Sequence, residues 1–83
     1  MKKDPLSKAF QASAKYILGE TTGVKIKGSP ERVIAFQEVL LASRHLYRAL
    51  TERRSLPEIS DLLRVKRKTA ADFNRVTGLV WVL

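Results

Sequence analysis

One long helical segment, residues 28–54 with the sequence GSPERVIAFQEVLLASRHLYRALTERR, constrains the fold of this chain more than any other feature. Ser29 is a favourable N-cap residue, Pro30 suits a first helical turn, and Glu31 matches the positive end of a helix dipole. From residue 33 to residue 41, apolar side chains recur on nearly every side of the predicted helix. Such a helix must be covered on several faces, so we expect it to be the central helix of a bundle.

The length of the chain, 83 residues, is enough for a single compact domain over residues 1–83 and too short for two. A domain of this size buries only about 60–65% of the surface that its unfolded chain exposes, so its core is thin. The sequence contains no cysteine, and His45 is its only histidine. Disulfides and a His-based zinc site within one chain are therefore excluded, and we expect neither a metal nor another cofactor.

Further helices are predicted on both sides of this segment. Asp4 as an N-cap and Pro5 in the first turn begin a helix of about residues 5–18. Ser55 and Glu58 have the spacing of a capping box, so another helix begins there.

Alternating and β-forming residues predict a minor β element. In VKIK, residues 24–27, apolar residues alternate with Lys25 and Lys27, a period that is typical of a half-buried strand. The run LVWVL, residues 79–83, consists of β-forming apolar residues. The expected fold class is therefore mainly α: a small bundle of three to four helices with a minor two-stranded β element at about residues 23–27 and 79–83.

Positive charge is the strongest signal in the composition. Lysine and arginine total 16 against 8 aspartate and glutamate residues, which gives a formal net charge of +8. An excess of this kind attracts polyanions, with nucleic acid as the usual partner and an anionic membrane surface as the next. The alternative, which remains open, is that the cations only keep the protein soluble and that it binds no anionic partner.

No apolar run approaches the ~20 residues that cross a bilayer. Residues 1–10 lack the apolar region of a signal peptide. We therefore expect a soluble protein that lies in the cytoplasm or is associated with the nucleoid, without membrane contact.

Residues 58–75 contain a cationic stretch with apolar positions at helical spacing on both sides. The apolar Ile59, the small Ser60 and the apolar Leu63 precede a possible tight turn at Arg64–Val65–Lys66. Ala70 and Phe73 follow the turn and would face inward. In this pattern the segment resembles the helix-turn-helix superfamily of DNA-binding proteins.

The resemblance implies that a second helix enters the major groove of duplex DNA. The residues that would then face DNA are Lys66, Arg67, Lys68, Thr69 and Asn74. Arg67 is the best candidate for a base contact, because a guanidinium binds a guanine edge through two hydrogen bonds. Phosphate contacts are available from further cations outside the motif: Arg53, Arg54, Lys25 and Lys27.

The bend is one of two interpretations of residues 58–77. The superfamily commonly has glycine at the bend, where this sequence has Arg64, and a left-handed backbone costs a non-glycine residue about 1–2 kcal/mol. A single straight helix also fits, because an apolar stripe runs along it: Ile59, Leu62, Val65, Thr69, Phe73 and Val76. The sequence leaves both interpretations open.

A compact DNA-binding regulator is the function that these features favour. We expect no enzymatic activity and no small-molecule substrate, because no serine lies in a nucleophile-elbow context and no close carboxylate pair is present. The apolar run needs cover that a twofold partner would supply, so we expect a homodimer with these interface residues: Leu79, Val80, Trp81, Val82 and Leu83. The alternative is a protein-interaction or assembly module, such as a small virion or scaffold component, with a solvated basic face.

Overall fold

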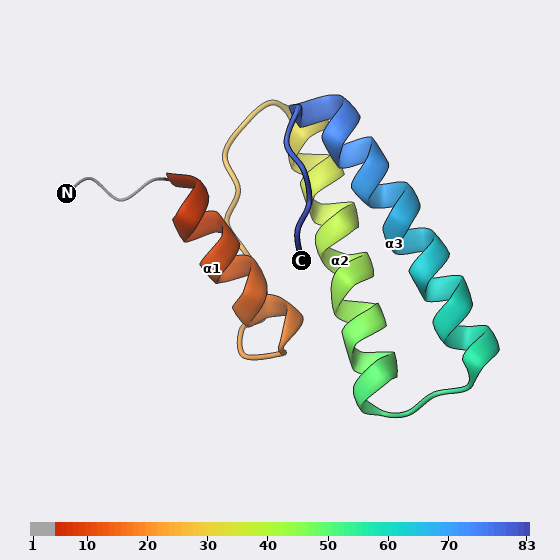
Figure 1. Ribbon diagram of the computed structural model, residues 1–83. Coiled ribbons are helices and arrows are strands. Elements are labelled where there is room, and N and C mark those ends of the chain that lie inside the picture. The colour runs from red at the N-terminus through yellow and green to blue at the C-terminus, as the bar shows by residue number, and fades with distance from the viewer. Residues whose placement is uncertain (1–4) are drawn as a thin grey trace.

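The chain forms a helical hairpin with a further helix packed against it. The computed structural model describes residues 5–83, with side chains from residue 9 onward. Its helices are α1 (Pro5–Ile17), α2 (Pro30–Thr51) and α3 (Leu56–Thr77). α2 and α3 run antiparallel side by side, and α1 packs against α2 and not against α3 (Figure 1). The mainly α fold and the central position of the 28–54 segment are confirmed, while the N-cap role of Asp4 lies outside the described residues.

The helices begin and end close to the residues that local sequence signals indicate. The Ser55 hydroxyl accepts a hydrogen bond from the backbone N–H of Glu58 at 3.4 Å, as in a capping box. Ser29 has the extended N-cap conformation at the start of α2, with φ −65° and ψ 153°. Gly19, two residues after the end of α1 at Ile17, has φ 85°, a left-handed conformation that glycine adopts without steric cost.

Four aromatic rings form the centre of the core. Phe36 of α2 and Phe73 of α3 both meet the Trp81 ring edge to face, with centroid distances of 5.6 and 5.5 Å. Phe10 of α1 lies 6.2 Å from the same ring. Trp81 belongs to the segment that follows α3, so this segment supplies a core residue, and its Leu83 packs against the same cluster.

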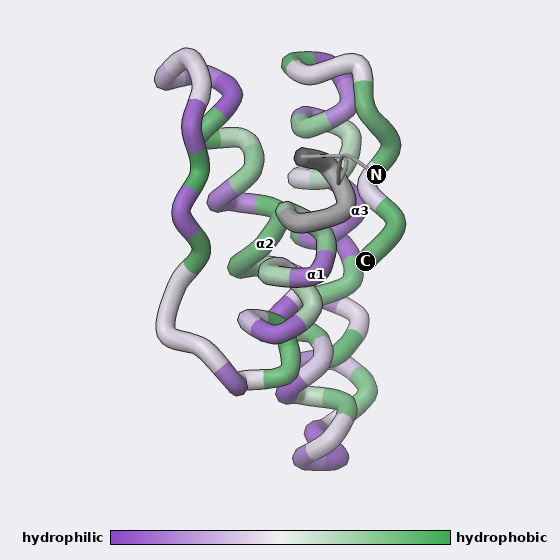
Figure 2. Tube along the Cα trace, turned by 90° about the vertical axis from the view of Figure 1, so that its left-hand side faces the viewer, coloured by the Kyte–Doolittle hydropathy of each residue, from purple (hydrophilic) through white to green (hydrophobic). Residues whose placement is uncertain are grey.

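The prediction of a two-stranded β element at residues 23–27 and 79–83 is wrong, because the structure contains no strand within residues 5–83. The alternation itself is present: the apolar residues of VKIK are half-buried and its lysines are exposed, and the colours along this segment alternate in Figure 2. Residues 79–83 instead run back along the helices (Figure 1). Val24 of the first segment and Trp81 and Leu83 of the second pack in or against the core cluster, so neither segment needs the other as a strand partner.

α3 is one helix from Leu56 to Thr77, which confirms the straight interpretation of residues 58–77. The turn that the helix-turn-helix resemblance implied at Arg64–Val65–Lys66 is therefore wrong. No glycine or proline interrupts the helix there, and its inner stripe packs along α2 for most of its length. A bend in the middle of α3 would remove much of that packing, which supplies most of the stability of a helix in a protein.

Candidate nucleic-acid interface

The outward face of α3 carries a row of exposed cations. Arg64, Lys68 and Arg75 recur at spacings of four and seven residues, so they lie on one side of the straight helix. Arg67 is exposed beside them, one step around the helix. With a rise of about 1.5 Å per residue, the row extends for about 16 Å.

Carboxylates on the same helix neutralise two of these cations. Arg64 Nη2 lies 2.7 Å from Asp61 Oδ1, and Arg75 Nη2 lies 3.5 Å from Asp72 Oδ1. Arg67 and Lys68 make no ion pair within the part of the chain that the structure describes. They are the α3 cations that are available to meet a phosphate without first leaving a carboxylate or, as for Lys66, a backbone carbonyl.

Three residues that the sequence predicted to face DNA make hydrogen bonds inside the chain. The half-buried Lys66 donates from Nζ to the backbone oxygen of Leu83 at 2.9 Å. Asn74 donates from Nδ2 to the backbone oxygen of Leu79 at 3.0 Å. The hydroxyl of Thr69 donates to carbonyl oxygens of its own helix. Lys66 and Asn74 thus hold both ends of the final segment against α3.

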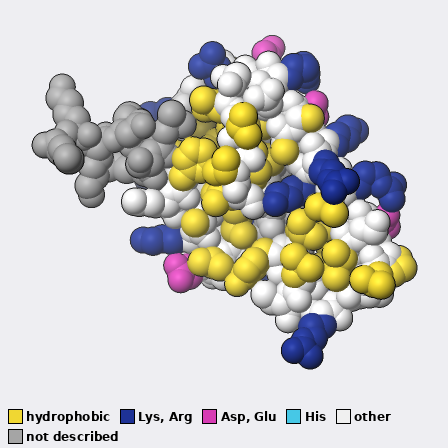
Figure 3. Space-filling model, in the orientation of Figure 1, with side chains coloured by type: hydrophobic (Ala, Val, Ile, Leu, Met, Phe, Trp, Pro, Cys, Tyr) yellow, Lys and Arg dark blue, Asp and Glu magenta, His cyan; other side chains and the backbone are white. Residues whose placement is uncertain are grey.

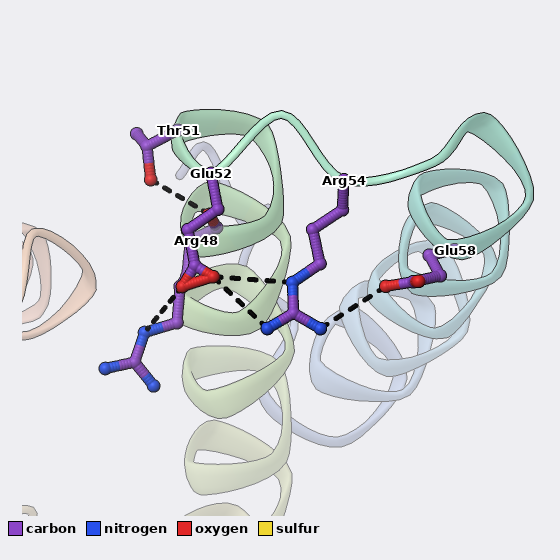
Figure 4. Close-up of polar contacts among 5 residues, drawn as sticks. All are labelled: Arg48, Thr51, Glu52, Arg54 and Glu58. Atoms are coloured by element: carbon purple, nitrogen blue, oxygen red, sulfur yellow. Dashed lines mark hydrogen bonds and ion pairs between the residues drawn. The ribbon is translucent and has the colours of Figure 1, made fainter.

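The hairpin end contains an exposed network of arginine and glutamate side chains (Figure 4). Arg54 donates from Nη2 to Glu52 Oε2 at 3.2 Å and from Nη1 to Glu58 Oε2 at 3.3 Å. The hydrogen bond to Glu52 and, to a smaller extent, the one to Glu58 raise the pKa of the Arg54 guanidinium above its usual value. Arg48 Nε lies 3.9 Å from the other oxygen of Glu52. Arg54 is therefore committed to the connection between α2 and α3, whereas the neighbouring Arg53 is exposed.

Lys25 and Lys27 lie far from the α3 row. They are exposed in the connection between α1 and α2, which runs on the side of α2 away from α3 (Figure 1). The structure therefore does not bring these two lysines together with Arg67 and Lys68 on one surface.

The predicted interface segment divides into inward and outward residues. Trp81 is 9% exposed, and its Nε1 donates to Ser43 Oγ at 2.9 Å, while Val80 and Val82 are 69% and 72% exposed. Sequence reasoning missed Ser43, which in turn donates to the backbone oxygen of Val39 at 2.8 Å. The sequence does contain a signal for this role: Ser43 is a serine within an otherwise apolar stripe of the central helix. A buried hydroxyl needs a polar partner, so a hydrogen bond there could have been expected.

Among the described residues, no group of three potential metal ligands occurs, and no helix combines the length and apolar character that crossing a bilayer requires. His45 is exposed and lines a shallow hollow whose two arginines, Arg48 and Arg54, are both paired with Glu52. Comparisons with protein-family models, with curated proteins and with solved structures gave no match.

Proposed function

We propose that this chain is a small, non-enzymatic, basic protein that binds nucleic acid, most readily duplex DNA, by laying the outward face of α3 on the phosphate backbone. The observation that carries the proposal is the pair Arg67 and Lys68, which are exposed and have no ion-pair partner within residues 5–83. Phosphates condense a counterion atmosphere, and cations that displace it gain affinity without reading bases.

The straight α3 changes the expected mode of binding. Base reading in the helix-turn-helix manner needs a short second helix that a turn separates from the first, and α3 has no such turn. The protein would therefore contact the phosphate backbone of the nucleic acid, as a regulator or a packaging protein of the cytoplasm or nucleoid. Sequence-independent affinity follows from this geometry.

Dimer formation is the second part of the proposal. Val80 and Val82 face outward from an extended segment, and two copies could cover them by pairing along residues 79–83. Trp81 takes no part in this contact, because the core of its own chain already covers it.

Fluorescence anisotropy with a short labelled duplex tests the nucleic-acid contact. With about four phosphates neutralised, the affinity should fall about a hundredfold between about 50 and 200 mM salt. Two unrelated duplex sequences should bind with similar affinity. The double variant Arg67→Ala and Lys68→Ala should lower the slope of log affinity against log salt by about 2.

The double variant Lys25→Ala and Lys27→Ala is the matched control, since it removes the same charge from the side of α2 away from α3. It should bind like the wild type. An equal loss in both double variants would assign binding to the overall charge, and no binding by the wild type at low salt would refute the proposal.

A further inference from the structure

The apolar stripe of α2 that faces residues 79–83 continues beyond them towards the hairpin end. Phe36 lies 5.6 Å from the Trp81 ring, and Ser43 accepts the Trp81 hydrogen bond, so both lie on the side of α2 that faces the final segment. A further step of seven residues leads to Leu50 on the same stripe. Leu40 of the core cluster leads in the same way to Tyr47.

α3 supplies a second apolar stripe beside that of α2. Ala70 packs against the core cluster, and steps of seven residues from it lead to Leu63 and Leu56 towards the hairpin end. We call the surface formed by Tyr47, Leu50, Leu56 and Leu63 the hairpin groove. Residues 79–83 extend along α3 as far as Lys66, whose Nζ donates to the Leu83 oxygen, and they do not cover the hairpin groove beyond it.

The hairpin groove is apolar and uncovered within the described part of the chain. Tyr47 is 40% exposed, Leu50 53% and Leu56 82%, while Leu63 is half-buried. α1 does not contact α3 and so does not close the groove. In the view of Figure 3, hydrophobic side chains gather over the hairpin with lysine and arginine around them. Apolar patches rimmed by polar residues mark sites of protein interaction.

The charges around the groove indicate the chemistry of its partner. Arg67 follows Leu63 by four residues on α3, Arg53 follows Leu50 by three residues, and neither arginine has an acidic partner among residues 5–83. The carboxylates of the hairpin are instead held by other arginines: Glu52 and Glu58 by Arg54, and Asp61 by Arg64. A partner that combines apolar and acidic side chains is complementary to such a surface, whereas a second copy would bring the same cations face to face.

We propose that the hairpin groove binds an acidic amphipathic segment of a partner protein. Apolar side chains of that segment would cover Tyr47 and Leu50, and its carboxylates would meet Arg67 and Arg53. This interaction surface borders the outward face of α3 and shares Arg67 with it, but its apolar contacts through Tyr47 and Leu50 do not depend on the nucleic-acid contact proposed above.

A synthetic helical peptide, with leucine at every third or fourth position and glutamate between, is the probe. Two-dimensional NMR spectra of the backbone amides of the full chain should show shifts that concentrate at the two walls of the hairpin groove. Leu50→Asp should weaken binding by at least about tenfold, because it removes an apolar contact and adds a like charge. Leu50 is already half exposed, so the variant should retain its melting temperature.

Ile34→Asp is the matched control. Ile34 lies on the same helix, is 54% exposed against 53% for Leu50, and points about 160° away around the helix axis. This variant should bind the peptide like the wild type. Leu50→Asp should also bind duplex DNA like the wild type, which separates this test from that of the proposed function.

Three results would overturn the inference. The first is no binding of the acidic peptide, or equal binding by Leu50→Asp. The second is equal affinity for a peptide in which lysine replaces every glutamate. The third is a wild-type dimer that Leu50→Asp converts to a monomer in sedimentation, since a second copy would then cover the groove.

Discussion

Arg53 has a backbone conformation that most helix ends reserve for glycine. Its φ is 53°, and it is the one residue other than glycine with a positive φ among the described residues. The N–H of Arg54 donates to the carbonyl of Ala49 at 3.0 Å, and the N–H of Arg53 to that of Leu50 at 3.3 Å, which together form a Schellman motif at the end of α2. Gly19 fills the corresponding place after α1. Arg53 therefore carries strain that Gly19 avoids.

Arg53→Gly should stabilise the protein by about 1 kcal/mol, because relief of the left-handed strain outweighs the greater chain entropy of glycine. In a domain of this size that gain raises the melting temperature by about 4–8 °C, which circular dichroism would measure. Arg53→Ala removes the same charge but keeps the strain, so it should melt close to the wild type. If the glycine variant melts no higher than the alanine variant, the strain is absent.

At the scale of elements, the final segment combines a buried side chain with outward-facing ones. Trp81 joins rings from all three helices, so its replacement by alanine should cost about 3–5 kcal/mol and endanger the fold. Deletion of residues 79–83 would therefore confuse loss of folding with loss of a dimer. Val80 and Val82 offer a cleaner test, because their side chains lie in solvent.

The double variant Val80→Lys and Val82→Lys should convert the proposed dimer into a monomer, since opposed lysines repel one another across a twofold contact. Analytical ultracentrifugation at several concentrations would measure the change, and a circular dichroism spectrum would verify that the helices remain. A wild-type chain that already sediments as a monomer at high concentration would contradict the dimer.

At the scale of the whole molecule, a net charge of +8 is spread over dimensions of 43 × 27 × 19 Å. At about 10 mM salt the Debye length is about 30 Å, so cations repel one another across most of the protein. The ion pairs that oppose this repulsion are exposed, and such pairs contribute about 0–1 kcal/mol each. Repulsion therefore dominates the electrostatic part of the stability.

The melting temperature should accordingly rise by about 2–4 °C between low and moderate sodium chloride, because screening weakens the repulsion. Differential scanning calorimetry at several salt concentrations would measure it. Lys27→Glu lowers the net charge by two at an exposed site and should flatten this dependence. A melting temperature that falls as salt is added would mean that the ion pairs outweigh the repulsion.

Local sequence signals determined the helices, their approximate ends and the periodicity of the segments between them. Caps such as Ser55 act within one turn, and the apolar character of residues 33–41 by itself required a covered, central helix. The net charge likewise needed no structure. Each of these properties depends on residues within a few positions of one another or on composition alone.

Tertiary structure alone decided whether α3 bends, where residues 79–83 pack and which cations remain unpaired. Lys66 and Asn74 matched a DNA-facing pattern, yet the return of the final segment gives their donors backbone partners. Trp81 could have paired as a strand, but Ser43, 38 residues away, offers it a hydrogen bond beside three aromatic rings. Contacts between residues so far apart in the chain outweigh local preference, because burying a large aromatic side chain yields more free energy than a short strand pair.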